Sequence, residues 1–220
     1  STVEISANQV DWTKNRRKFY FHPLQMISSL LPSTGTLEGR TLVQVFGSSF
    51  QKAPSTCKFG SHTVDAIVVD SNLIHCNAPL STAPGAVSFE LSQNSQDYTN
   101  SGISYLYHEI VIDRLEPTGG PSTGNTQVNI IGSGFLNLLT LRCKFGNTVV
   151  AAIWISPEEI WCTSPAGYEG LAELEVSNNN ADFSAQGNKF EYYTRTTVVR
   201  VAPSSGVNSG NTEVTVFGTN

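Results

Sequence analysis

The sequence is poor in charged side chains, since Asp, Glu, Lys and Arg make up only 14% of its 220 residues. Its formal net charge of −5 argues against a nucleic-acid partner held by phosphate neutralisation. No apolar run approaches the roughly 20 residues that a spanning helix needs, so we expect no membrane contact within this segment. Gly, Ser, Thr and Asn are abundant instead, a composition typical of all-β extracellular modules.

Catalytic signatures are also missing. The chain has no Gly-x-Ser-x-Gly elbow, Walker loop, HExxH motif or EF-hand loop. His22 and His108 each follow a short aromatic run, which indicates a structural position at a strand edge rather than half of an active site. His62 and His75 stand without partnering motifs. We therefore expect no enzyme activity and no cofactor in this chain.

One stretch of sequence occurs three times. Its copies share a frame of proline, glycine and alternating apolar residues, spaced 85 and then 86 residues apart. The frame residues are Pro32, Gly35, Gly39, Val43, Val45 and Gly47, then Pro117, Gly120, Gly124, Val128, Ile130 and Gly132, then Pro203, Gly206, Gly210, Val214, Val216 and Gly218. A period this long is one domain rather than one solenoid turn. The alternation predicts that Val43, Val45, Val128 and Ile130 face a core.

The repeat divides the chain into four parts. We expect complete domains at residues 24–108 and 109–195. Residues 1–23 match the ends of both units, which predicts the C-terminal strands of a preceding repeat, and residues 196–220 are expected to be the N-terminal strands of a following one. No Gly/Ser-rich linker separates the two complete units, which favours a semi-rigid rod.

Each complete unit reads as a series of strands. Short apolar or alternating runs are separated by Gly, Pro, Asn and Ser clusters, and no helical period is long enough to count. About seven such strands in a unit of this size predict a β-sandwich.

Four cysteines form two pairs with the same spacing. Cys57 and Cys76 lie 19 residues apart in the first complete unit, and so do Cys143 and Cys162 in the second. Zinc ligands come more often as close CxxC pairs with histidines nearby. We predict two intradomain disulfides, each worth about 3 kcal/mol in the chain-entropy model, and hence an oxidising location. Two pairs of buried free thiols in a reducing compartment are the alternative.

Several short motifs resemble the IPT/TIG family. The second unit carries Gly-Ser-Gly-Phe at 132–135, Cys-Lys-Phe-Gly at 143–146, Ile-Trp-Cys-Thr-Ser-Pro at 160–165 and Glu-Val-Ser-Asn at 175–178. The first unit matches at the corresponding positions. This is the immunoglobulin-like domain shared by plexins, related receptors and some transcription factors. The resemblance implies an all-β fold of tandem immunoglobulin-like sandwiches joined end to end, with a binding or architectural role.

An Asn-x-x-Asp pair recurs at the same place in each repeat. The pairs are Asn8 and Asp11, Asn94 and Asp97, and Asn179 and Asp182. Their oxygens suit calcium, but Asn and Asp also close turns by bonding their own backbone. One pair offers too few ligands for an ion, so we predict turns and no metal site.

The two complete units differ most before the first cysteine and around the second. The second unit has a leucine-rich insert, 136–141, where the first has Gln51–Thr56, and the second unit is one residue longer before its cysteine. Trp154 replaces Val68, and Trp161 replaces His75. By alternation, Trp161 points outward if Ile160 and Cys162 point inward. Exposed leucine and tryptophan are costly unless they meet a partner. The candidate interface residues are Leu136, Leu138, Leu139, Trp154 and Trp161. The alternative is that the insert packs against its own domain or its neighbour.

These observations lead to one main functional hypothesis. We expect a structural or adhesive segment of a long extracellular or cell-surface protein, with other proteins as partners, further copies of the chain among them. A filament built by strand addition is one form of such contact, for which the alternating stretch 213–217 is suited. The alternatives are the stalk of a plexin-like signalling receptor, and accessory modules of a larger extracellular enzyme.

Overall fold

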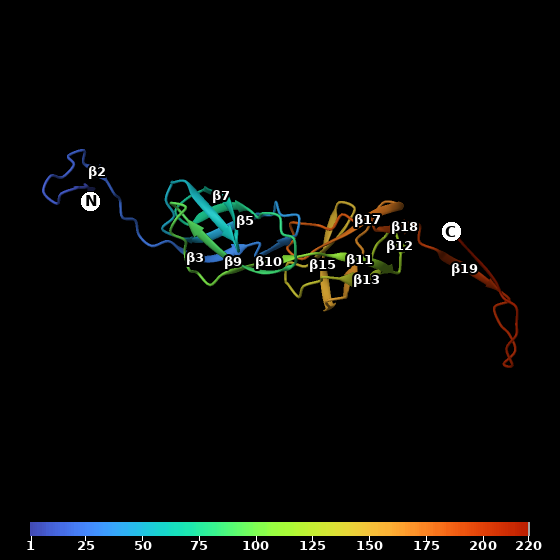
Figure 1. Ribbon diagram of the computed structural model, residues 1–220. Coiled ribbons are helices and arrows are strands. Elements are labelled where there is room, and N and C mark those ends of the chain that lie inside the picture. Colours follow the sequence, from blue (N-terminus) through green and yellow to red (C-terminus); the bar gives the residue numbers. More distant parts are fainter. Residues whose placement is uncertain (220) are drawn as a thin grey trace.

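The computed structural model describes residues 1–219, and all of the helix or strand structure within them is β-strand. Figure 1 shows two bodies that follow one another along the chain, with a hairpin-like segment extending from each end. No helix among the described residues could cross a membrane. The all-β fold expected from the sequence is confirmed.

The first body is one sheet of eight strands that surrounds its own core. Its strands are β3 (Met26–Leu31), β4 (Thr34–Thr36), β5 (Leu42–Ser48), β6 (Ser55–Phe59), β7 (His62–Val68), β8 (Leu73–Asn77), β9 (Gly85–Ser92) and β10 (Ser104–His108). They are ordered β3-β5-β8-β7-β6-β9-β10-β4. β4 pairs in parallel with β10, whereas the other neighbours are antiparallel.

The second body repeats this topology. Its strands are β11 (Val111–Glu116), β12 (Gly119–Pro121), β13 (Gln127–Ser133), β14 (Arg142–Phe145), β15 (Thr148–Ser156), β16 (Glu159–Thr163), β17 (Gly170–Ser177) and β18 (Lys189–Tyr193). The order β11-β13-β16-β15-β14-β17-β18-β12 is the same arrangement, one repeat later. Each body thus has one strand more than the seven expected, because the short β4 and β12 join their sheets.

The residues at the chain ends form two small hairpins. β1 (Thr2–Val3) pairs with β2 (Arg17–Lys18), and β19 (Thr197–Ala202) pairs with β20 (Thr215–Thr219). β19 carries a bulge where β3 and β11 carry theirs, and its register with β20 matches that of β11 with β13. The β19–β20 hairpin therefore has the same strand pairing as the β3–β5 and β11–β13 pairs of the two bodies.

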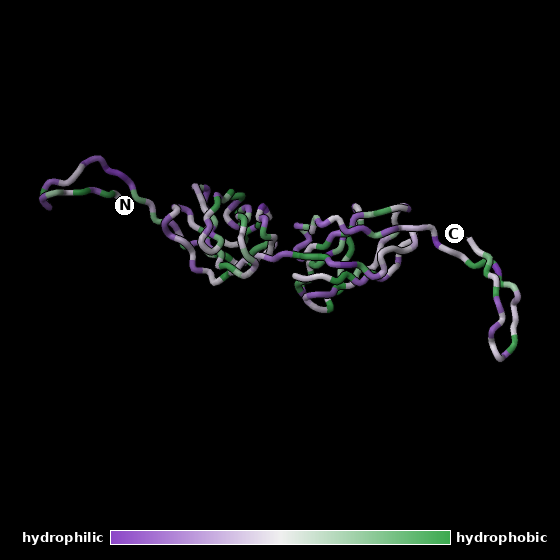
Figure 2. The backbone as a smooth tube through the Cα atoms, turned by 45° about the vertical axis from the view of Figure 1, so that its right-hand side comes forward, coloured by the Kyte–Doolittle hydropathy of each residue, from purple (hydrophilic) through white to green (hydrophobic). Residues whose placement is uncertain are grey.

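Period-two alternation builds both cores, as the sequence predicts. Val43, Val45, Val128 and Ile130 are fully buried, and Figure 2 shows apolar stretches running through the inside of each body. Edge-to-face aromatic pairs occupy matching positions in the two cores: Phe59–Tyr105 and Tyr105–Tyr107 in the first, and Phe145–Phe190 and Phe190–Tyr192 in the second. Such pairs add stabilisation beyond the area that they bury.

Candidate functional site

The leucine-rich insert of the second sandwich is only partly exposed. Leu136 is half-buried and Leu141 is buried, whereas Leu139 is 96% exposed. Leu138, at 37%, lies near the boundary of exposure. The insert bonds to Asn178 through two groups: the Leu136 amide donates to Asn178 Oδ1 (3.0 Å), and the Thr140 hydroxyl donates to the Asn178 carbonyl (2.7 Å). The insert thus packs largely on its own domain and leaves Leu139 as its projecting side chain.

Trp154 does not belong to the exposed surface, so its place among the interface residues is corrected. Its ring packs against the core of its own sandwich, and its Nε1 donates to the Phe135 carbonyl at 3.1 Å. The reason is alternation along β15, which points Trp154 inward together with Val150 and Ala152. Trp154 is a structural residue.

Trp161 lies on the outer face, as alternation predicts, and it has an apolar neighbour that the sequence reasoning missed. Trp161 is half-buried, and its Nε1 donates to Glu159 Oε1 at 2.7 Å. It pairs across the sheet with Ile153, which is 61% exposed. Val149 and Ile155 continue this outward row along β15. A signal was present in the sequence, because residues 149–155 are an unbroken apolar run and such a run places apolar side chains on both faces of a strand.

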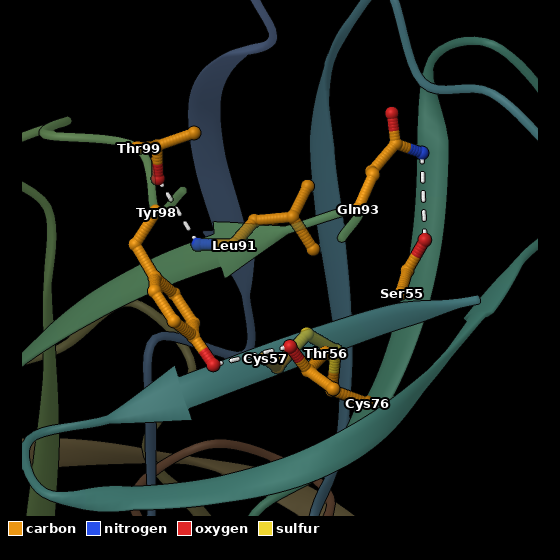
Figure 3. Close-up of a disulfide and its surroundings, with 8 residues drawn as sticks. All are labelled: Ser55, Thr56, Cys57, Cys76, Leu91, Gln93, Tyr98 and Thr99. Carbon is orange, nitrogen blue, oxygen red and sulfur yellow. Dashed lines mark hydrogen bonds between the residues drawn. A yellow bond between two sulfur atoms is a disulfide. The ribbon is translucent and has the colours of Figure 1, made fainter. Parts of the chain in front are cut away.

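The disulfides join strands that are not neighbours in the sheet. Cys57 on β6 bonds Cys76 on β8, and Cys143 on β14 bonds Cys162 on β16, with β7 or β15 between them. In Figure 3, the Cys57–Cys76 bridge lies close to the loop that follows β9. That loop is fastened by hydrogen bonds from the Leu91 amide to Thr99 Oγ1 (3.0 Å) and between Thr56 Oγ1 and the Tyr98 hydroxyl (3.2 Å).

The two sandwiches are joined by direct hydrogen bonds as well as by the chain. Asn179 Nδ2 donates to the Thr34 carbonyl at 2.8 Å, and Thr41 Oγ1 donates to Asp182 Oδ2 at 2.7 Å. Asn179 and Asp182 belong to the turn after β17, whereas Thr34 and Thr41 lie in the first sandwich. The sequence analysis predicted the turn but gave no sign of its partners.

This junction gathers buried polar groups. Thr34, Thr41, His108, Asn178 and Asn179 are each less than 9% exposed. Asn178 Nδ2 lies 3.3 Å from His108 Nδ1 and 2.9 Å from the Gly134 carbonyl. Buried polar groups stabilise a contact only when they are hydrogen-bonded, and then they fix its geometry. The hydrogen bonds of Asn178, Asn179 and Thr41 therefore favour the arrangement of the two sandwiches seen here.

His108 is the titratable group at the centre of the junction. Burial lowers its pKa to about 4, against a smaller opposing effect of the Asp182 charge. Its Nε2 has no hydrogen-bond partner within the described chain. A cleft of about 400 Å³ adjoins it, lined by Thr36 to Arg40, His108 to Ile110 and Asp182 to Gln186. His108 is thus a buried residue of the junction, whereas its counterpart His22 is exposed.

A chain of β-sandwiches, each bridged by a disulfide and hydrogen-bonded to its neighbour, is a tandem immunoglobulin-like protein. The IPT/TIG domain family matches the chain twice, at residues 26–107 and 111–192. These ranges cover most of the sequence, so the chain belongs to the IPT/TIG family. The resemblance carried by the glycine and cysteine motifs is confirmed.

The relatives are large proteins. The chain is 27% identical to human Plexin-A4 over 205 residues, which is 88% of the chain but 11% of that protein. It is 28% identical to human Fibrocystin-L over 228 residues, 98% of the chain and 5% of that protein. A structure of the full extracellular region of Plexin A4 superposes with a TM-score of 0.58 at 23% identity, over 98% of the chain and 19% of that structure, a likeness in fold.

Proposed function

We propose that this chain is an architectural segment of an extracellular protein, which holds successive immunoglobulin-like sandwiches in a fixed relative orientation. The observation that carries the proposal is the hydrogen-bonded junction, with Asn179 and Asp182 on one side and Thr34 and Thr41 on the other. Matches to Plexin-A4 and Fibrocystin-L, together with the disulfides, support the extracellular location. In a plexin-like receptor such a segment serves as a stalk, and in a longer repeat protein it serves a structural or adhesive role.

The test of this proposal is the stiffness of the junction. Changing Asn179 and Asp182 to alanine removes the hydrogen bonds to Thr34 and Thr41 and leaves only the Asn178–His108 contact among those described above, so the sandwiches should sample many orientations. Spin labels carried by non-natural residues at Thr63 on β7 and Thr148 on β15, both of which are exposed, would report the distance distribution. We expect one narrow distance in the unaltered chain and a broad distribution in the variant.

A matched control is present in the same chain. Asn94 and Asp97 form the corresponding turn of the first sandwich, and they are exposed. Changing these two residues to alanine should leave the distance distribution narrow. A broad distribution in the unaltered chain would refute the architectural proposal.

We also propose that the second sandwich contacts other proteins, with a further copy of the chain as the partner. The supporting observation is the outward row of Val149, Ile153 and Ile155 on β15, beside Trp161 and within the same domain as Leu139. Exposed apolar side chains grouped in this way are typical of interaction surfaces. We assign this segment no catalytic step.

Sedimentation equilibrium at increasing concentration tests this contact. Serine at both Ile153 and Trp161 should weaken self-association by roughly tenfold or more, because two apolar contacts at a hot spot are worth at least 1.4 kcal/mol. Ile67→Ser is the control, because Ile67 is 69% exposed at the corresponding place in the first sandwich, where its cross-strand neighbour is His75. An unaltered chain that stays monomeric at all concentrations would exclude the homotypic contact.

A further inference from the structure

We propose that the Asn94–Asp97 turn of the first sandwich is a docking site for a preceding IPT repeat. It would bind that repeat as Asn179 and Asp182 bind the first sandwich, through a backbone carbonyl and a threonine hydroxyl. The inference rests on the proposed architectural function. It extends that function from the one junction seen here to the junctions between other successive repeats, each made by an Asn-x-x-Asp turn.

The three Asn-x-x-Asp turns have the same internal geometry. Asn Nδ2 donates to Asp Oδ2 at 2.8, 2.7 and 2.7 Å in successive copies, and the Asp amide donates to Asn Oδ1 at 2.8 Å in each. The residue after Asn has a positive φ in all three: Gln9 (60°), Ser95 (60°) and Asn180 (58°). Each turn therefore presents its Asp carboxylate and Asn amide in the same way, whether or not a partner is in contact.

Only the third turn has its partner in this structure. Asn179 is 7% exposed and Asp182 is half-buried, because the first sandwich covers them. Asn94 and Asp97 are exposed at the corresponding position. The difference lies in what covers the turn and not in the turn itself.

The loop that carries Asn94 and Asp97 is already held in place. Gln93 Nε2 donates to the Gln51 carbonyl at 2.7 Å on one side of the turn, and Gln93 also approaches Ser55 Oγ (Figure 3). On the other side, Tyr98 and Thr99 bond to β6 and β9 beside the Cys57–Cys76 bridge. A fixed loop loses little conformational entropy when a partner binds, which favours docking.

The threonine that donates to the Asp carboxylate at the junction is repeated as well. Thr41 Oγ1 packs closely against Gly35: a Cβ added at Gly35 would lie only 2.4 Å from it. The other two copies have the same packing. A Cβ added at Gly120 would lie 2.2 Å from Thr126 Oγ1, and one added at Gly206 would lie 2.5 Å from Thr212 Oγ1. The turn between the glycine and the threonine has two successive left-handed residues in each copy: Gly39 and Arg40, Gly124 and Asn125, and Gly210 and Asn211. Every repeat in this chain thus carries a preset threonine hydroxyl at the same end.

A second cleft marks the place where the preceding repeat would lie. It has a volume of about 270 Å³ and is lined by residues 19–25 and by Gln93, Asn94, Asp97, Tyr98 and Thr99. The cleft at the established junction is lined in the corresponding way by His108 to Ile110 and by Asp182 to Gln186, but the threonine-bearing loop of the first sandwich completes it. Residues 19–25 thus enter the first sandwich as His108 to Ile110 enter the second.

One part of the established junction is not repeated. Asn178 of the second sandwich contacts His108 of the first, whereas the corresponding Gln93 bonds within its own domain. The inferred contact therefore depends on the Asn and Asp pair and not on a histidine. This difference makes Asp97 the residue on which the test depends.

The test uses a chain in which one repeat is duplicated, with residues 1–108 followed directly by residues 23–220. This joint keeps the order of residues after His108 the same as that after His22. The turn of the second copy then meets Thr34 and Thr41 of the first copy. Spin labels at Thr63 in both copies, introduced through a non-natural amino acid so that the cysteines stay paired, report the distance between the copies.

We expect a narrow distance that becomes broad when Asp97→Ala is made in the second copy only. The undocked population should rise by roughly tenfold, the change that loss of one hydrogen bond to a charged group produces. Asp97→Ala in the first copy changes the same residue without a threonine partner, and it should leave the distance unchanged. Asp97→Asn in the second copy, which keeps an acceptor oxygen, should largely preserve docking.

Thr41→Val in the first copy removes the same hydrogen bond from the other side, so it should broaden the distance distribution equally. This variant leaves Asp97 in place, so the result cannot be caused by misfolding of the Asp97 turn. Equal behaviour of the two Asp97→Ala chains, or no effect of Thr41→Val, would overturn the inference. Asp182→Ala in the duplicated chain, with labels across the established junction, tests the proposed function separately. If the established junction is rigid and the junction between the two copies is flexible, this inference is wrong and the proposed function still stands.

Discussion

Replacing Ile130 with alanine is expected to lower the free energy of unfolding of the second sandwich by about 2–5 kcal/mol. Ile130 is fully buried, and it pairs across the sheet with Leu115 on β11 and Ile160 on β16. The three side chains belong to one core cluster. Alanine at this central position removes apolar contacts and leaves a cavity that the strands can close only in part.

Tryptophan fluorescence during denaturant unfolding measures this loss. Trp154 and Trp161 both lie in the second sandwich, and residues 24–108 contain no tryptophan. The third tryptophan, Trp12, is 53% exposed in the N-terminal segment, so Trp12→Phe is made in every variant and the remaining signal reports the domain that carries the change. Gln127→Ala on the same strand is the control, because Gln127 is exposed and its loss should cost less than about 0.5 kcal/mol. A cost below half a kilocalorie for Ile130→Ala would contradict the assigned face of β13.

The repeat frame predicted the fold well because it encodes local and periodic constraints. Alternating apolar residues such as Val128 and Ile130 must face one side of a strand, and equal spacing of Cys57–Cys76 and Cys143–Cys162 reflects the same strand pairings in two domains. These features depend on neighbours within one unit. They could therefore be recognised by comparing a unit with its copies.

The junction could not be predicted in the same way. Asn179 and Thr34 are far apart in the sequence, and their contact depends on how two finished sandwiches meet. The three Asn-x-x-Asp turns look alike in the sequence, yet only one of them is covered in this structure. Sequence alternation likewise predicted an outward Trp161. It did not show that Trp154 faces the core, because that depends on the register of β15 with β16.

Acidification is expected to weaken the contact between the sandwiches through His108. Burial lowers the pKa of His108 from 6.5 to about 4, so the neutral ring is the form that fits the junction. When the junction is opened or the domain unfolds, the ring regains its ordinary pKa, and the open form binds the proton first. Stability is therefore full above pH 6.5, falls as the pH drops toward 4, and levels off below that.

The size of this loss of stability follows from the pKa of His108 in the folded chain and its ordinary pKa. Each pH unit between them costs about 1.4 kcal/mol, so roughly 2 kcal/mol should be lost between pH 7 and pH 5, and about 3 kcal/mol by pH 4. The other charged groups that line the adjoining cleft, Glu38, Arg40, Glu109 and Asp182, are present in any variant at residue 108 and form the common background. A comparison between two proteins at each pH isolates the histidine.

His108→Gln provides that comparison, because the glutamine side chain is polar but does not titrate. Calorimetric unfolding at pH 7 and pH 5 should show the unaltered chain losing about 2 kcal/mol more than the variant, since only the unaltered chain takes up a proton at this position. An NMR titration of the imidazole should give a midpoint near 4 for His108. Parallel losses in the two proteins, or a midpoint near 6.5, would show that the buried ring does not control the junction.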